Sequence, residues 1–392
     1  MGALPFRIEF GPRAIEDLHR RLDAARWPAV PFDTGWSAGT NDAVLRDLVD
    51  YWRRDFDWFA VQERLNAFPH IRAPIAQPAL STVEGGDEEL HAVLLTRGGP
   101  PRIPVVLLHG WPGSFIELLP AAQRLVEDGA DGSPGADVVV PSLPGFGFSD
   151  APRGPGMHPG RIAERIHGLM RLLGYERYGV QGGDWGAIVG ARLARAHPEA
   201  VLGLHLNFPA GLVPLEDGVT PTAEEAAYQQ RLARWREDES GYSHLQGTKP
   251  QTLAYALTDS PVGLLAWILE KFWRYSDRAT GEGDDLWQTF SRDDLLANVT
   301  LYWLTGSALS SARTYYERNN EEPPHRPTTR VEVPTALANY PAEPWAAPRA
   351  LLERSFNLVR WTDQPAGGHF AALEQPDLFA ADVRAFFDSL PR

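Results

Sequence analysis

The chain has 392 residues and a formal net charge of −14, from 37 Lys and Arg against 51 Asp and Glu. This acidic balance argues against nucleic acid or an anionic membrane surface as the main partner. The absence of cysteine excludes disulfides, thiolate metal sites and cysteine nucleophiles.

The first eighty residues are predicted to be helical. Apolar residues recur at helical spacing between Ala14 and Trp27, and Asn41 is placed to cap a second helix that runs through Tyr51. Arg7 and Glu9 stand where a signal peptide would need its apolar stretch, and no apolar window approaches the roughly 18 residues of a membrane helix. We therefore expect a cytoplasmic protein with no membrane partner.

The next segments change to strand-like patterns. These begin between Ala79 and Thr96, around a turn at Gly85-Gly86-Asp87. Further on, short apolar runs bounded by Gly or Pro predict strands at Ile103 to Leu108, Asp137 to Pro141, Tyr178 to Gly182 and Leu202 to Asn207. Helical patterns separate them, for example at Arg161 to Leu173 and Ala187 to Ala196. This alternation predicts an α/β fold with a mostly parallel sheet and helices on both faces.

The alternation stops after Phe208 and resumes near the C-terminus. The intervening sequence is helical and rich in Trp and Tyr, with loops at 279–285 and 321–329. Strands follow at Val333 to Asn339 and Asn357 to Thr362, and a last helix spans Asp377 to Leu390. We interpret the chain as four parts: an N-terminal region (1–80), the first part of an α/β core (81–208), a helical cap (209–328) and the second part of the core (329–392).

The segment Gly182-Gly183-Asp184-Trp185-Gly186 has the pattern of a nucleophile elbow, in which a strand turns sharply into a helix. Small residues two positions either side of Asp184 let such a strained turn present the central side chain. An Asp carboxylate can displace a leaving group at a saturated carbon and form an ester. The same residues are also compatible with an alternative, a Gly-rich turn in which the Asp caps the following helix.

A second motif, His109-Gly110-Trp111-Pro112-Gly113, directly follows an apolar strand. In α/β-hydrolases the loop at this place gives one backbone N–H to the oxyanion hole, and the residue after the nucleophile gives the other. The expected donors are therefore the amides of Trp111 and Trp185. Taken without this context, the motif is an ordinary strand-ending turn with a buried histidine.

A third motif, Gly367-Gly368-His369-Phe370, lies between the last strand and the last helix. The chain order of nucleophile, acid and base in α/β-hydrolases makes His369 the candidate base, with a near-neutral intrinsic pKa suited to activating water.

The acid that orients His369 is expected on the loop after the strand Val333 to Asn339, where Glu343 is our choice. Asp363 and Glu353 are its competitors. A different location, after Leu202 to Asn207, offers only Asn207 before Glu216.

Together these segments resemble the microsomal-type epoxide hydrolases, a branch of the α/β-hydrolases with an extra N-terminal domain and a helical cap. The resemblance extends over nearly the whole chain, including the cap stretches 239–251 and 298–318. It implies an epoxide hydrolase in which two cap tyrosines, Tyr242 and Tyr315, activate the epoxide oxygen. A phenol suits this task because it stays protonated at neutral pH. The charge-relay acid of the family is Asp or Glu, which agrees with Glu343.

The resemblance also sets expectations about partners. A small epoxide and water are the substrates, no metal or organic cofactor is needed, and aryl or alkenyl epoxides are our first expectation because the chain is rich in aromatic residues. Many animal members carry an N-terminal membrane anchor that this sequence does not show, so we expect a bacterial enzyme of detoxification or secondary metabolism. A homodimer is expected on general grounds.

Two alternatives share these motifs. Haloalkane dehalogenases use the same Asp elbow and His, and in them the Trp after the nucleophile helps to bind halide, a role that Trp185 could fill. A non-catalytic α/β-hydrolase that serves as a binding protein is the second alternative. The tyrosine pair and the long N-terminal region favour the epoxide hydrolase.

Overall fold

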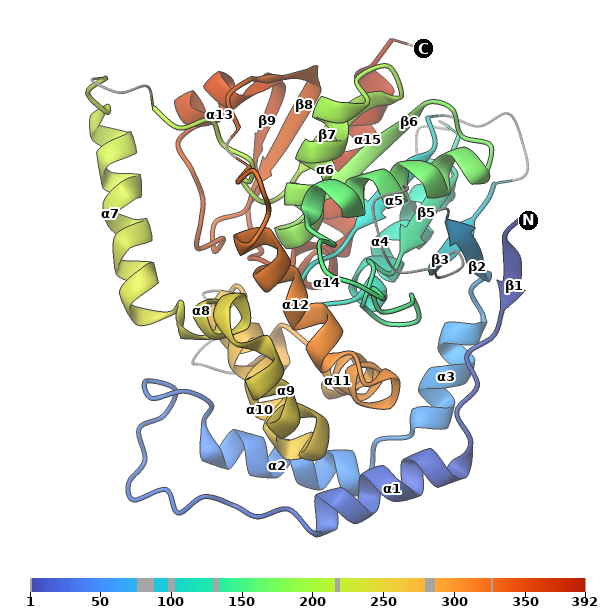
Figure 1. Cartoon of the computed structure of the whole chain (residues 1–392), viewed down its shortest axis with the longest axis vertical. Helices are drawn as coiled ribbons and strands as arrows, with labels where there is room; N and C mark the ends of the chain where they lie inside the picture. The colour runs from blue at the N-terminus through green and yellow to red at the C-terminus, as the bar shows by residue number, and fades with distance from the viewer. Residues whose placement is uncertain are drawn as a thin grey trace.

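The computed structural model describes residues 2–75, 88–97, 103–129, 134–215, 219–278, 286–325 and 327–391. Figure 1 shows a sheet with flanking helices in the upper part of the molecule, the cap helices below it, and the N-terminal helices at the foot. The predicted turn Gly85-Gly86-Asp87 and the predicted loop 279–285 lie outside the described residues.

A nine-stranded sheet forms the centre of this described structure, in the order β1-β2-β3-β5-β4-β6-β7-β8-β9. The strands are β1 Leu4–Phe6, β2 His70–Ile75, β3 Glu88–Leu95, β4 Val105–Leu108, β5 Val138–Pro141, β6 Tyr178–Gly182, β7 Val201–Leu206, β8 Val331–Asn339 and β9 Phe356–Asp363. From β5 to β9 all neighbours run parallel, whereas β1, β2, β3 and β5 pair antiparallel. The prediction of a mostly parallel α/β sheet is confirmed.

Helices cover both faces of the sheet, as expected from its apolar strands. The core helices are α4 Phe115–Val126, α5 Pro159–Leu172, α6 Asp184–Ala196, α13 Arg349–Ser355, α14 Ala371–Glu374 and α15 Pro376–Ser389. Helices α4, α14 and α15 contact one another on one face, and α5 contacts α6 on the other. Strands β4 and β5 are buried along their whole length because they lie between these two layers.

The N-terminal region contains helices α1 Pro12–Asp23, α2 Asp42–Arg54 and α3 Trp58–Asn66. Asn41 caps α2 as predicted, since its side chain accepts a hydrogen bond of 3.1 Å from the Val44 amide. The description of the first eighty residues as helical was incomplete, because β1 and β2 lie in this region and extend the sheet. β1 has only three residues, and β2 carries polar residues and a proline, so neither shows the continuous apolar run of the inner strands.

The cap consists of helices α7 Ala223–Asp238, α8 Gly241–Thr248, α9 Pro250–Asp259, α10 Pro261–Tyr275, α11 Arg292–Thr305 and α12 Ala308–Asn319, with a short 3-10 helix at Leu286–Gln288. The N-terminal helices pack against it from below (Figure 1). A buried hydrogen bond of 3.0 Å from Trp52 Nε1 to Thr300 Oγ1 joins α2 to α11. The cap is therefore held between the sheet and the N-terminal helices.

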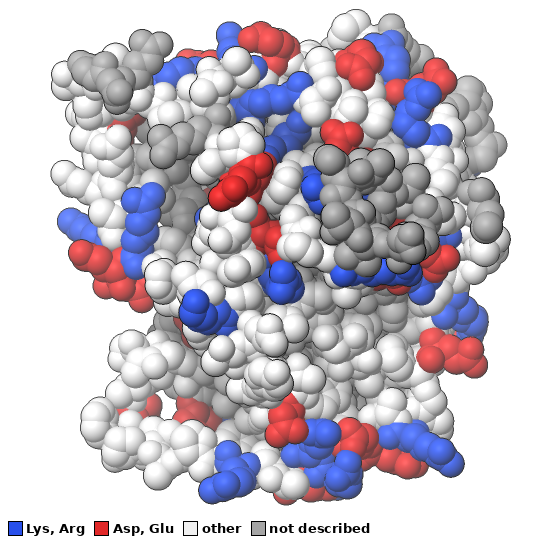
Figure 2. All heavy atoms as spheres, in the orientation of Figure 1, with Lys and Arg blue, Asp and Glu red and all other residues white. Residues whose placement is uncertain are grey.

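Acidic and basic side chains are interspersed on the face shown in Figure 2, including the foot of the molecule. There the N-terminal helices carry ion pairs such as Arg53 with Asp23, at 2.7 Å. Within the described part of the chain, no single helix has the length and apolarity to span a membrane, and only the pair α9 and α10, bent by 116°, meets those criteria jointly.

Candidate active site

The nucleophile elbow forms where strand β6 meets helix α6. Asp184 has a φ of 46°, and among the described residues it is the one non-glycine with a positive φ. An added Cβ at Gly182 would lie 2.3 Å from the Gly186 carbonyl oxygen, and one at Gly186 would lie 2.0 Å from that of Leu108. The strained backbone thus requires glycine at both places, as the sequence pattern predicted.

The loop after β4 supplies a hydrogen bond to the Asp184 carboxylate. The Trp111 amide donates to Asp184 Oδ1 at 2.8 Å. The cap fixes this loop from above, because Asn298 donates to the Pro112 carbonyl and the Tyr302 hydroxyl to the Gly113 carbonyl, both at 2.8 Å. Trp185 is the second residue of α6, directly after Asp184, and the role of its amide in the oxyanion hole stays a prediction.

His369 lies between two carboxylates. Its Nδ1 is 2.9 Å from Glu343 Oε2, and its Nε2 is 3.5 Å from Asp184 Oδ2. Since a carboxylate only accepts, Nδ1 carries the proton in this contact and leaves Nε2 to face the nucleophile. The side chains of His369 and Glu343 are buried, with 3% and 2% exposed. The three predicted residues of the catalytic triad are therefore brought together by the fold.

The charges around His369 favour its protonated form. Burial alone would lower its pKa, but Glu343, and with it Asp184, hold the pKa well above its ordinary value. Formation of an ester at Asp184 would remove one of these two negative charges. The imidazole would then give up its proton more readily, which is the change that a base needs in the second half of an ester mechanism.

The competing acids lie elsewhere. Asp363 accepts hydrogen bonds from Asn339 and from Trp361 at 2.9 Å each, and Glu353 pairs with Arg349 on the surface. Asn207 is buried and accepts from Gln181 at 2.8 Å, whereas Glu216 lies outside the described residues. Of the described candidates, Glu343 is the carboxylate that contacts His369.

The two predicted cap tyrosines come together over the nucleophile. Tyr242, from α8, and Tyr315, from α12, are both buried, and their ring centroids are 5.9 Å apart. Trp111 stacks on Tyr242 at 5.1 Å and meets Tyr315 edge-on at 5.9 Å, while Trp185 meets Tyr315 at 4.7 Å. These contacts place both phenols beside the two residues whose amides were predicted as donors.

The phenols of Tyr242 and Tyr315 are held protonated by their surroundings. Burial raises the pKa of each, and the nearby Asp184 carboxylate raises it further. The next residue, Tyr316, is only half buried and lies under the Arg313 guanidinium, at 5.6 Å. Tyr242 and Tyr315 are therefore suited to donating hydrogen bonds to an oxygen bound above Asp184.

The loop that carries His369 is anchored by acids that the sequence did not single out. Glu374 accepts from the amides of Gly368 and Phe370, at 3.0 and 2.9 Å, and also from the amide of Asp277, at 2.7 Å. The His369 amide donates to the Tyr275 carbonyl at 2.9 Å. Because Tyr275 is the last residue of cap helix α10 and Asp277 follows it, these bonds fix the base relative to both cap and core.

Aromatic side chains complete the surroundings. His369 lies within 5.8 Å, between ring centroids, of Phe208, Tyr275 and Trp345. Tyr275 also lies 6.4 Å from Tyr242. Phe208, Tyr275 and Trp345 were not predicted as site residues, because their spacing along the chain does not reveal which aromatic residues face the site.

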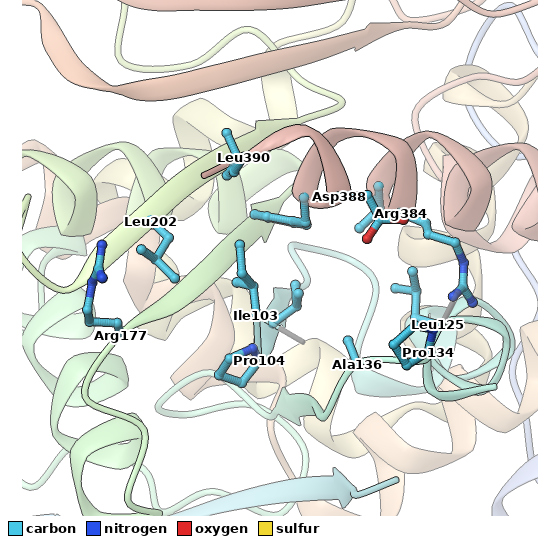
Figure 3. A pocket seen from close by; sticks show the side chains of 13 residues that line it. Ile103, Pro104, Leu125, Pro134, Ala136, Arg177, Leu202, Arg384, Asp388 and Leu390 are labelled. Atoms are coloured by element: carbon cyan, nitrogen blue, oxygen red, sulfur yellow. The ribbon is translucent and has the colours of Figure 1, made fainter. Parts of the chain in front are cut away.

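A different hollow lies at the opposite edge of the sheet. Its volume is about 310 Å³, and Ile103, Leu125, Leu202, Arg384 and Leu390 are among the residues that line it (Figure 3). Ile103 and Leu202 stand near the amino ends of β4 and β7, whereas the predicted catalytic residues follow carboxyl ends of strands. This pocket is therefore separate from the Asp184 site. Among the described residues, no group of three or more His, Asp and Glu is arranged to hold a metal ion.

Comparison with known families agrees with the geometry. Residues 3–118 match the family described as "Epoxide hydrolase N terminus", and residues 103–376 match "alpha/beta hydrolase fold". The chain is 35% identical to epoxide hydrolase 1 of Oryctolagus cuniculus over 418 residues, which cover 99% of this chain and 89% of that protein.

Solved structures give the same result. The juvenile hormone epoxide hydrolase of the silkworm Bombyx mori superposes with a TM-score of 0.84 at 32% identity, covering 99% of this chain and 93% of that one. The Aspergillus niger epoxide hydrolase gives a TM-score of 0.85 at 29% identity, covering 100% and 97%. These relatives are epoxide hydrolases, which favours that activity over the dehalogenase and non-catalytic alternatives. The chain belongs to the epoxide hydrolases of the α/β-hydrolase fold.

Proposed function

We propose that this epoxide hydrolase converts an apolar epoxide to a vicinal diol through a covalent ester on Asp184. The observation that carries this proposal is the joint geometry of Asp184, which has one oxygen bound by the Trp111 amide and the other 3.5 Å from His369 Nε2. Oδ1 is the oxygen held by the amide, so Oδ2 is the free nucleophile. The two tyrosines lie on the cap side, where the oxygen of the epoxide would be.

In the first step, Asp184 Oδ2 bonds to an epoxide carbon and the ring C–O bond breaks. The electron pair moves to the epoxide oxygen, which takes a proton from Tyr242 or Tyr315. Acid assistance of this kind accounts for about 10²- to 10⁴-fold in rate. The product of this step is an alkyl ester of Asp184 that carries one free hydroxyl.

In the second step, His369 takes a proton from water while the water oxygen attacks the ester carbon. The negative charge that develops on Oδ1 is stabilised by the amides of Trp111 and Trp185, the two predicted donors of the oxyanion hole. Collapse of this intermediate expels the second diol oxygen, which takes the proton from His369. The proton left on the Asp184 carboxyl returns to the tyrosine, so one water is consumed for each epoxide.

The aromatic surroundings support an aryl or alkenyl epoxide as the substrate class. Trp111, Phe208, Tyr275 and Trp345 present ring faces and edges around the reacting groups. Such walls favour flat apolar groups, which gain from both burial and aromatic contacts. We also propose that the enzyme is cytoplasmic and bacterial, that it acts in detoxification or secondary metabolism, and that it forms a homodimer. These parts of the proposal rest on the sequence alone.

The proposal is tested by incubating the purified protein with a matched panel of aryl epoxides, alkyl epoxides and haloalkanes of the same carbon skeleton. We expect diol from the epoxides, fastest for the aryl members, and no halide release. Halide release without diol would support the dehalogenase alternative. Turnover of alkyl epoxides that exceeds that of the aryl ones would overturn the proposed substrate class while leaving the reaction intact.

A further inference from the structure

A small cavity lies behind the nucleophile, on the side away from the cap tyrosines. Its volume is about 20 Å³, and Gly110, Gly113, Glu117, Asp184, Asn207 and His369 are among the residues that line it. A space of this size holds about one water molecule. A water there would lie between the carboxyl group that forms the ester and the imidazole that acts as base.

Glu117 reaches this cavity from the first turn of α4. Its Oε2 atom is buried and has no hydrogen-bond partner among the described residues. An added Cβ at Gly113 would lie 1.6 Å from this oxygen, so glycine at that position leaves the space that the carboxyl group occupies. A buried oxygen without a hydrogen-bond partner destabilises the folded protein, and a bound water removes this cost.

The electrostatics of the site make Glu117 a neutral acid. Burial raises its pKa to about 8, and the Asp184 charge acts in the same direction while His369 opposes it. The site therefore avoids a second negative charge beside the nucleophile at neutral pH. A neutral carboxyl group can donate one hydrogen bond and accept another, which suits the binding of a water molecule.

We propose that Glu117 holds the water that hydrolyses the Asp184 ester. This inference rests on the proposed function, because it assigns a residue to the second step of that reaction. The water donates one O–H to His369 Nε2 and the other to the Glu117 carboxyl, which turns an oxygen lone pair toward the ester carbon. When the C–O bond forms, the proton passes to His369 and the electron pair to Oδ1, and Glu117 keeps its own proton. Glu117 is thus a positioning residue for the second substrate.

Two substitutions separate this role from a structural one. Glu117→Gln keeps a donor and an acceptor of nearly the same shape, whereas Glu117→Met keeps the volume and removes both. The rates of ester formation and ester loss are measured in single turnovers with an aryl epoxide, by quenching and intact mass. Gln123→Leu, on the exposed face of the same helix, serves as the control for changes in α4.

We expect Glu117→Met to form the ester at a rate within about threefold of the parent and to hydrolyse it about 10- to 100-fold more slowly, the range for a lost hydrogen bond to a reacting group. Ester should then accumulate in the steady state. Glu117→Gln should hydrolyse the ester within about fivefold of the parent. An unchanged rate of ester loss in Glu117→Met, or equal slowing of both steps, would overturn the proposal.

A second measurement covers the case in which Glu117→Met does not fold. A high-resolution crystal structure of the parent protein should show an ordered water within hydrogen-bond distance of both Glu117 Oε2 and His369 Nε2, and a dry cavity would contradict the proposal. The same assays distinguish failure of the proposed function from failure of the role proposed for Glu117. Failure of the parent to form any ester rejects the proposed function itself, whereas ester that forms and is hydrolysed normally in Glu117→Met rejects only the role of Glu117.

Discussion

The catalytic edge of the sheet and the cap hold their functional side chains in different ways. At the sheet edge, backbone geometry places the groups: Asp184 sits in a strained elbow, and the Trp111 amide donates directly to it. In the cap, Tyr242 and Tyr315 are placed by ring packing against each other and against Trp111. We infer that the nucleophile tolerates almost no change in its surroundings, whereas changes in the cap reduce rate without removing the mechanism.

The largest effect is expected at the elbow. In Gly186→Ala the new Cβ would collide with the backbone of Leu108, so the turn that presents Asp184 cannot form as it is. We expect diol formation to fall by at least about 10⁴-fold, the order of loss when a nucleophile is removed, and stability to fall by about 1 to 3 kcal/mol. Gly241→Ala in the cap is the matched control, because its Cβ would meet nothing within 4 Å. Near-normal activity of Gly186→Ala would show that backbone geometry is not what places the nucleophile.

The tyrosines come next. We expect Tyr242→Phe and Tyr315→Phe each to slow ester formation by about 10- to 100-fold, and the double variant to slow it by about 10³-fold or more, because one phenol can partly replace the other. Ring packing is kept, so unfolding temperatures should change little. Pre-steady-state measurement of the ester checks this prediction. Loss of ester hydrolysis instead of ester formation would mean that the tyrosines do not serve as the acid for the epoxide oxygen.

Glu343, the charge-relay acid, is expected to affect ester hydrolysis through the pKa of His369. Glu343 raises the pKa of His369, so Glu343→Gln should lower it. Because water activation requires neutral imidazole, ester hydrolysis rises with pH through this pKa, and its midpoint should move to lower pH in the variant. We also expect the maximal rate to fall by about 10- to 100-fold, since the ring loses the partner that orients it. A midpoint that stays in place or moves upward, in a pH profile of ester decay, would contradict this role for Glu343.

A smaller effect is expected on the pH dependence of stability, through two buried histidines where the N-terminal region contacts the core. His70 Nδ1 lies 2.8 Å from His91 Nε2, and His91 Nδ1 lies 2.9 Å from Ser142 Oγ, all buried. Burial lowers the pKa of both imidazoles, so both are neutral in the folded protein. The unfolded chain takes up protons near pH 6.5, and stability is therefore complete above that pH and is lost as the pH falls below it.

We expect the free energy of unfolding of the parent to decrease between pH 7 and pH 5 by about 1 kcal/mol or more through this pair. His91→Gln should be less stable at pH 7 and should show a weaker dependence on pH. Chemical denaturation at the two pH values measures both quantities. An equal pH dependence in parent and variant would assign the acid sensitivity to other groups.

The sequence revealed the parts of the site that contiguous motifs encode. The elbow around Asp184, the loop at Trp111 and the His369 loop each combine small residues with a polar one directly after a strand, and the structure brings them together. Strand β1 was missed because it has only three residues, and β2 because His70, Arg72 and Pro74 interrupt the apolar run by which the inner strands were predicted. The exact ends of predicted elements also moved, as for α1, which ends at Asp23 and not at Trp27.

Glu117, Tyr275 and Glu374 could not be identified from the sequence alone, because their importance depends on burial beside residues that are far away in the chain. One signal did exist for Glu117. It is a single carboxylate near the start of the apolar segment Phe115–Val126, and a charged residue in such a place needs a partner or a function. A search for isolated charges in apolar helices that follow catalytic loops would have found it.

The proposed mechanism requires that Asp184 becomes covalently bound to the substrate, and the mass of the protein reveals this bond. A His369→Gln variant is mixed with a simple aryl epoxide and its intact mass is recorded, with the His369→Gln, Asp184→Ala double variant as the control. We expect a mass gain equal to one whole epoxide that persists in the single variant, because the base is missing, and that is absent in the double variant. No adduct in the single variant, under conditions in which the parent forms diol, would contradict the covalent mechanism.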